Sequence, residues 1–143
     1  MWDDLTLAKE QIEYGLENCD VLKIADNELQ FVTGLYDYDE GIEYIQKKYN
    51  IKLILLTLGK DGSRAYYNGI KVEMPAKSVK TVDTTGAGDT FCGCILNYIL
   101  ENSLNDLSKE QIGEMLSIAN TAAAIVTTRK GALKAMPKMD EIK

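Results

Sequence analysis

The sequence predicts an α/β fold in which a mainly parallel sheet, flanked by helices, carries a β-hairpin at one side. Helix-forming and strand-forming segments alternate along the chain, an order that builds parallel sheets. Residues 51–58 form an Ile/Leu-rich run, typical of a strand covered on both faces. Asn68-Gly69 separates two short strand-like segments, and this dipeptide favours a two-residue type I′ hairpin turn.

The first third of the chain is expected to form three helices and one buried strand. Helices are predicted at residues 4–18, 27–32 and 38–48, and the strand at residues 21–25. Apolar residues recur every three or four positions in the first helix. Asp37 or Asp39 can cap the third helix, and Lys47-Lys48 suits its C-terminal end, where the helix dipole favours cations.

The rest of the chain is expected to supply the sheet centre, the hairpin and two long helices. The strands are predicted at residues 51–58, 63–67 and 70–74, and one helix runs from Gly88 to about Leu100. Residues 108–111, Ser-Lys-Glu-Gln, form a capping box that opens the last long helix. That helix is expected to end at Arg129-Lys130-Gly131. With no repeat or linker in view, residues 1–143 are interpreted as one domain.

Composition excludes several functional classes. The net charge is −6 without a basic cluster, which argues against nucleic acid and anionic membranes as partners. No apolar stretch is long enough to span a bilayer, and residues 1–4 show no signal peptide, so we expect a cytoplasmic protein. Three cysteines fit a reducing compartment, and the absence of histidine excludes His-based catalysis.

The most informative segment is residues 82–91, Val-Asp-Thr-Thr-Gly-Ala-Gly-Asp-Thr-Phe. Gly86 and Gly88 lie where an extended segment passes into an apolar helix. A helix start has free N–H groups and a positive dipole, so an anionic group can approach it closely. Asp89 follows at once. An anion hole beside a carboxylate suits phosphoryl transfer to an alcohol. The alternative is a glycine turn with a dipole-compatible Asp in the first helical turn.

These ten residues resemble the second signature of the ribokinase-like (PfkB) sugar kinase family, D-T-x-G-A-G-D-x-F. The resemblance implies a ribokinase-like fold and transfer of the γ-phosphoryl of ATP to a sugar hydroxyl. It implies that Asp89 is the catalytic base and that the N–H groups of Gly86, Ala87 and Gly88 form the anion hole. Neither a Walker A motif nor G-x-G-x-x-G is present.

Two further segments resemble the nucleotide-binding parts of this family. The first comprises Thr57, Leu58, Gly59, Lys60, Asp61 and Gly62, similar to the family's T-L-G-x-x-G segment. The second is residues 119–124, similar to its A-N-x-A-A-A helix, in which Asn120 would lie near ATP. Taken alone, the first segment also fits a simple turn, and the second fits close helix packing by small residues.

Other matches concern metal ions. Asp83 and Thr85, together with the backbone around Val126, Arg129 and Gly131, resemble the monovalent-cation site of the ribokinase branch. Ala135 stands where that branch often has a hydroxyl, so binding of K⁺ stays open. Glu28 matches the glutamate of the family's N-x-x-E element, which helps to position Mg²⁺, whereas Ala25 replaces the asparagine. Glu28 could equally be a solvated helix residue. Residues 23–29 are most similar to the fructokinase branch.

The resemblance covers nearly the whole chain but only the carboxy-terminal half of a family member. We therefore expect a nucleotide-binding and catalytic-base half, without most of the sugar site. ATP and a small sugar are the partners that the resemblance implies for the intact enzyme. An exposed sheet edge would favour a homodimer. The alternatives are a non-catalytic nucleotide-binding or assembly fragment, and a kinase of a nucleoside or another small alcohol.

Overall fold

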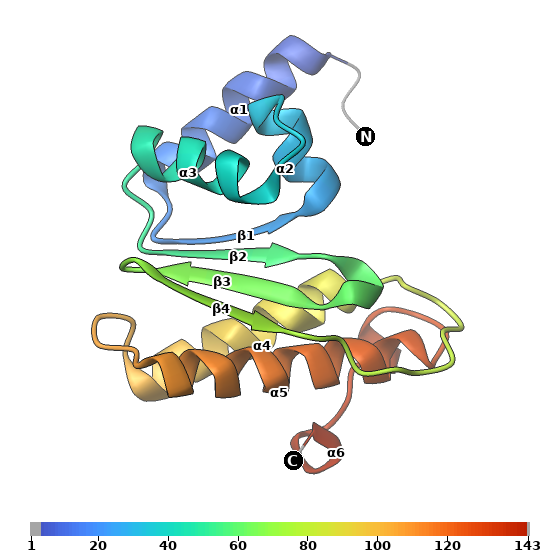
Figure 1. Ribbon diagram of the computed structural model, residues 1–143. Coiled ribbons are helices and arrows are strands. Elements are labelled where there is room, and N and C mark those ends of the chain that lie inside the picture. The colour runs from blue at the N-terminus through green and yellow to red at the C-terminus, as the bar shows by residue number, and fades with distance from the viewer. Residues whose placement is uncertain (1–3, 143) are drawn as a thin grey trace.

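Four strands form one sheet, and helices cover both of its faces (Figure 1). The computed structural model describes residues 4–142. The strands are β1 (Val21–Ala25), β2 (Leu53–Thr57), β3 (Ser63–Tyr67) and β4 (Ile70–Met74), and they lie in this order across the sheet. β1 and β2 are parallel, whereas β2–β3 and β3–β4 are antiparallel. The predicted α/β class and hairpin are confirmed, and the hairpin makes the sheet of the described residues mixed.

Three helices pack on one face of the sheet. They are α1 (Leu5–Asn18), α2 (Asp26–Thr33) and α3 (Tyr38–Lys48). Their apolar side chains join Ile54 and Leu56 of β2 in one buried cluster. Of the two predicted caps of α3, Asp37 accepts the Glu40 N–H at 2.9 Å. Asp39 instead accepts hydrogen bonds from Tyr66 and Lys71, and so ties α3 to the hairpin.

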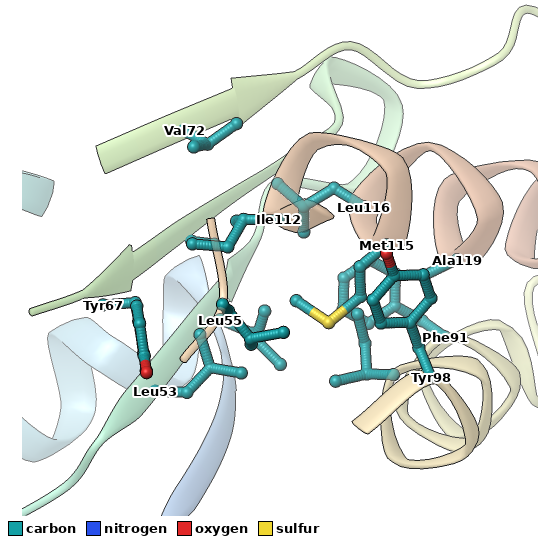
Figure 2. Close-up of a cluster of buried hydrophobic side chains, with 13 residues drawn as sticks. Leu53, Leu55, Tyr67, Val72, Phe91, Tyr98, Ile112, Met115, Leu116 and Ala119 are labelled. Atoms are coloured by element: carbon teal, nitrogen blue, oxygen red, sulfur yellow. The ribbon is translucent and has the colours of Figure 1, made fainter. Parts of the chain in front are cut away.

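Two long helices cover the other face. They are α4 (Ala87–Asn102) and α5 (Lys109–Thr127). Figure 2 shows Leu53 and Leu55 of β2 facing Phe91 and Tyr98 of α4 and residues of α5. Because alternate residues of β2 enter opposite cores, Leu53 to Leu56 are all fully buried. This explains the Ile/Leu run in the sequence.

The ends of the elements follow from local sequence. Asn68 and Gly69 both have positive φ (46° and 76°), as a type I′ turn requires. The predicted capping box at Ser108 is present, with Gln111 as its partner. Two further short helices follow α5, namely η2 (Leu133–Ala135) and α6 (Met139–Ile142), and η1 (Gly59–Asp61) follows β2.

One expectation about the connection into α4 was wrong. The segment before Gly86 was expected to be extended, as a strand would be. Residues 75–86 contain no strand. Instead, the N–H groups of Val82 and Asp83 donate to the Thr127 carbonyl at 2.7 and 3.1 Å. The loop is therefore held by the end of α5 rather than by the sheet.

Candidate active site

The N-terminus of α4 leaves backbone donors free. Gly86 precedes the helix with φ 83°, and no side chain caps it. The positive φ favours glycine here, and a Cβ at Gly86 would also be tightly placed, 3.2 Å from the Cα of Ala132. Of the residues expected to form the anion hole, Ala87 is already engaged, because its N–H donates to the Thr84 carbonyl at 3.2 Å. The N–H groups of Gly88 and Asp89 have no acceptor among residues 4–142. Two free N–H groups and the helix dipole can stabilise an anion.

The Asp83 carboxylate organises the loop before α4. It accepts hydrogen bonds from the Thr85 N–H at 2.9 Å, the Thr85 hydroxyl at 2.7 Å and the Gly131 N–H at 3.3 Å. These donors lower the pKa of the Asp83 carboxyl. Three of the five residues matched to a monovalent-cation site are thus brought together.

The other two are placed differently. Val126 is buried, and its carbonyl accepts the Arg129 N–H at 3.2 Å. The Arg129 guanidinium pairs with Glu141 of α6. The backbone oxygens of this region, rather than these side chains, are therefore the groups that could contact a cation.

The loop after β2 folds back against the end of β4. The Leu58 N–H donates to the Gly62 carbonyl at 2.8 Å. Gly62 has φ 107°, and a Cβ there would lie 2.1 Å from the Met74 carbonyl oxygen. Only glycine fits this approach. Of the six residues matched to the nucleotide segment, Gly59 and Lys60 line the largest nearby pocket, while Leu58 and Asp61 line a smaller hollow on another side of the loop.

Asn120 on α5 is buried and fully engaged by the fold. Its Oδ1 accepts the Ser63 hydroxyl at 3.0 Å, and its Nδ2 donates to the carbonyls of Met74 and Pro75 at 3.0 and 3.2 Å. Asn120 therefore joins α5 to the ends of β3 and β4. It also lines the pocket, so it shapes the wall while its polar atoms hold neighbouring segments in place.

These segments enclose a pocket of about 560 Å³, called here the lysine pocket. Its lining is Gly59, Lys60, Ala76, Lys77, Ser78, Val79, Thr81, Thr84, Ala87, Asn120, Ala123, Ala124 and Thr127. It contains two lysines and no carboxylate, although the whole chain has a net charge of −6. The start of α4 contributes Ala87. A polyanion would find both cations and a helix N-terminus here.

Asp89 lies on the other side of the first turn of α4. It is exposed and lines a hollow of about 490 Å³, the Asp89 hollow, formed by α1, β1 and the start of α4. It also borders a hollow of about 520 Å³ between α4, α5 and the C-terminal segment. The lysine pocket and Asp89 thus flank the same helix start.

Glu28 is held at the start of α2. Its Oε2 accepts the Ala25 N–H at 2.7 Å and lies 3.3 Å from Lys23 Nζ. The side chain is about half exposed (55%). Glu28 therefore caps the start of α2, which agrees with the alternative that it is a solvated helix residue. Its other carboxylate oxygen stays accessible.

Sequence reasoning missed the segment 76–81, which forms much of the wall of the lysine pocket. Lys77 follows closely after the end of β4 and lies between the small residues Ala76 and Ser78. This basic residue could have indicated a phosphate-binding wall from the sequence. Lys23 was also missed as a contact of Glu28. Among residues 4–142, no group of three or more Cys, Asp or Glu side chains could hold a metal ion. In the same range, no helix has the length and hydropathy needed to cross a membrane.

Comparison with known proteins identifies the family. The model of the pfkB family carbohydrate kinases matches residues 1–139. The chain belongs to this family. It is 36% identical to probable fructokinase-2 of Arabidopsis thaliana over 137 residues, and 36% identical to fructokinase-2 of Solanum lycopersicum over 141 residues. These matches cover 96% and 99% of the chain but 42% and 43% of the two relatives.

Solved structures of pfkB-type kinases share the fold. A fructokinase double mutant from Vibrio cholerae O395, solved with fructose, ADP and potassium ion, superposes with a TM-score of 0.88 at 29% identity. Aminoimidazole riboside kinase from Salmonella enterica, solved with aminoimidazole riboside and an ATP analog, gives 0.84 at 28% identity. Both matches cover 99% of this chain but only 45% and 46% of those chains. The chain therefore spans less than half the length of these four proteins and matches their C-terminal portion.

Proposed function

We propose that this chain is the nucleotide-binding and base-bearing portion of an ATP-dependent sugar kinase of the fructokinase type. The observation that carries the proposal is the start of α4. Its free N–H groups lie between a pocket with two lysines and the exposed carboxylate of Asp89. The fructokinase relatives and the ADP-bound structure of one of them support this interpretation.

The chemistry follows from the placement of the residues. Lys60 and Lys77 attract the phosphates of ATP to the lysine pocket. The N–H groups of Gly88 and Asp89 stabilise the charge on the transferred phosphoryl group. The Asp89 carboxylate orients a sugar hydroxyl and takes its proton. The hydroxyl oxygen then bonds to the γ-phosphorus, and the bond from this phosphorus to the β–γ bridging oxygen breaks, releasing ADP.

The residues also fit the ions that the family implies. The accessible oxygen of Glu28 can hold water bound to Mg²⁺, a metal that prefers to keep several waters. Mg²⁺ would neutralise charge on the phosphates. Asp83 and the backbone oxygens near the end of α5 offer the oxygen donors that K⁺ prefers. Three unpaired cysteines are in keeping with a cytoplasmic location.

Nucleotide binding is the first test. Titration calorimetry should detect ATP with Mg²⁺ and give clearly weaker heats for an unrelated anion such as sulfate. Lys77→Met should weaken ATP binding, whereas Lys109→Met, outside the pocket lining, serves as a control. Equal binding of ATP and sulfate, or no binding, would exclude the proposed nucleotide site.

Two alternative functions are each favoured by a particular observation. The likeness to a riboside kinase at 28% identity favours a nucleoside or another small alcohol as the acceptor. The match to less than half of the fructokinase relatives named above favours a fragment that binds nucleotide without catalysis. A coupled assay of ATP consumption with fructose, ribosides and no acceptor separates the three. We expect no useful turnover from the chain alone, because orienting the acceptor is worth about 7–11 kcal/mol of barrier.

We also propose that the chain self-associates through the edge of the sheet at β1. Among residues 4–142, β1 pairs with β2 alone, and α4 exposes Leu96 and Leu100. A second copy would cover both the strand edge and the apolar side chains. Light scattering should give a mass above the 15.9 kDa of one chain. A monomer at all concentrations would contradict this proposal.

A further inference from the structure

Lys23 occupies an unusual place in the sheet. It lies in the middle of β1 opposite Leu55, so its side chain is on the face covered by α4 and α5. The neighbours on this face of β1 and β2 are apolar, and the Lys23 side chain is only 22% exposed. A lysine in such a layer needs a partner for its charge.

The ammonium group of Lys23 connects two parts of the candidate site. It lies 3.3 Å from Glu28 Oε2 at the start of α2. On its other side, a Cβ placed on Gly88 would be 3.7 Å from Lys23 Nζ, so the first turn of α4 passes directly over it. Lys23, Gly88 and Asp89 all line the Asp89 hollow.

The two oxygens of Glu28 are used unequally. Oε2 receives both the Ala25 N–H and the Lys23 ammonium. No donor to Oε1 is found in the part of the chain that the structure describes. The carboxylate is thus fixed through one oxygen, while the other is left for an outside partner.

Resting on the function proposed above, we propose that Lys23 is a positioning residue. It locks Glu28 beside the first turn of α4, so that Oε1 holds a water of a phosphate-bound magnesium ion. The competing explanation is that Lys23 only places an inward charge on an edge strand, which discourages unwanted strand pairing. That role needs the charge of Lys23 but not its contact with Glu28. The two explanations therefore differ in whether the effects of substituting Lys23 and Glu28 on Mg²⁺-dependent ATP binding depend on one another.

The test measures how strongly Mg²⁺ improves ATP binding, by calorimetry at several Mg²⁺ concentrations. In the unaltered chain Mg²⁺ should strengthen binding. Lys23→Met should reduce this gain about tenfold, as changes at outer-shell partners of metal sites do. Glu28→Gln should have a similar effect, and the double variant should lose no more than either single one, because the two residues act as one unit. Lys47→Met, which breaks the exposed pair with Glu43 on α3, is the matched control.

The outcomes are distinct. If the unaltered chain binds no Mg-ATP, both the proposed function and this inference are overturned. If it binds and Lys23→Met behaves like Lys47→Met, or if the losses of Lys23→Met and Glu28→Gln add, the inference alone is overturned. If Lys23→Met does not fold, the same measurements are made on Lys23→Gln.

A second measurement needs no nucleotide. In amide NMR spectra, Lys23→Met should shift the resonances of Glu28 on α2 and of Gly88 and Asp89 on α4. Changes confined to β1 and its neighbour β2 would contradict the bridge between α2 and α4.

Discussion

The lysine pocket and the Asp89 hollow flank the same helix start but differ in how completely this chain builds them. The lysine pocket draws its walls from the ends of β2 and β4, the start of α4 and the middle of α5. Buried hydrogen bonds from Asn120 and the close approach of Gly62 to Met74 hold these walls together.

The Asp89 hollow is less enclosed. It is bounded by α1, β1 and α4, and it runs along a strand that pairs on one side only. Asp89 itself is exposed. The described residues thus enclose the lysine pocket, which is the nucleotide side of the proposed site, more fully than the Asp89 hollow, which is its acceptor side. Changes on the nucleotide side should therefore alter folding and ATP binding together, whereas changes at Asp89 should alter turnover alone.

Substitution of Asp89 is expected to have the strongest effect, which is on turnover. In a chimera that adds the amino-terminal portion of a fructokinase relative, Asp89→Asn should lower turnover about 10²–10⁴-fold, the usual contribution of a general base. Stability should change by about 1 kcal/mol or less, through the helix dipole only. Asp26→Asn, in the first turn of α2, is a matched control for the dipole effect. Near-normal turnover of Asp89→Asn would reduce Asp89 to a helix-start residue.

The next effect should come from Gly62. Gly62→Ala should destabilise the fold by about 3 kcal/mol or more, because the new Cβ meets backbone atoms and the φ of 107° is strained for alanine. Gly15→Ala, inside α1 with no atom within 4 Å of the added Cβ, should instead stabilise by about 0.5–1 kcal/mol. Thermal unfolding measures both. A small loss for Gly62→Ala would show that the loop wall can relax.

Asn120→Ala should cost about 2 kcal/mol, because the buried Ser63 hydroxyl and two carbonyls lose their partner. It should also weaken ATP binding, since the ends of β3 and β4 are released from α5. Asn97→Ala, whose side chain bonds only to the exposed Glu101, is the control and should change neither. Denaturant unfolding and calorimetry together test the claim, which fails if stability drops while ATP affinity stays the same.

The smallest effect concerns Thr90, next to Asp89. Its hydroxyl is buried and has no hydrogen-bond partner among the described residues. Thr90→Val keeps the shape and removes the unpaired polar group, so it should stabilise the fold by about 1 kcal/mol. Thr6→Val, on the exposed face of α1, should stay within about 0.5 kcal/mol of the unaltered chain. A loss of stability in Thr90→Val would reveal a partner for this hydroxyl.

The helices and strands were predicted well from the sequence, because the patterns that indicate them involve residues close together in the chain. The hairpin bounds, the capping box at Ser108 and the buried strand within residues 51–58 all depend on neighbours in the chain. The site was foretold in part. One short segment predicted the glycine-rich start of α4 and grouped Asp83 with Thr85, which the structure joins by a hydrogen bond.

The remaining features of the site depend on contacts between distant residues. The engagement of Asn120 with Ser63 spans 57 positions, and the contact of Gly62 with Met74 needs the hairpin to fold first. The path of residues 75–86 could not be predicted either, because it is fixed by the Thr127 carbonyl at the end of α5, which is distant in the sequence. Roles of Asp89, Glu28 and Asn120 toward ligands stay predictions.

The order β1-β2-β3-β4 across the sheet has a consequence for how the chain folds. The antiparallel pairings β2–β3 and β3–β4 close short loops and lose little chain entropy, which favours their rapid formation. The parallel β1–β2 pairing spans a longer connection that contains α2 and α3. During synthesis on the ribosome, β2, β3 and β4 each follow the strand with which they pair, and α4 and α5 follow the sheet strands to cover the second face.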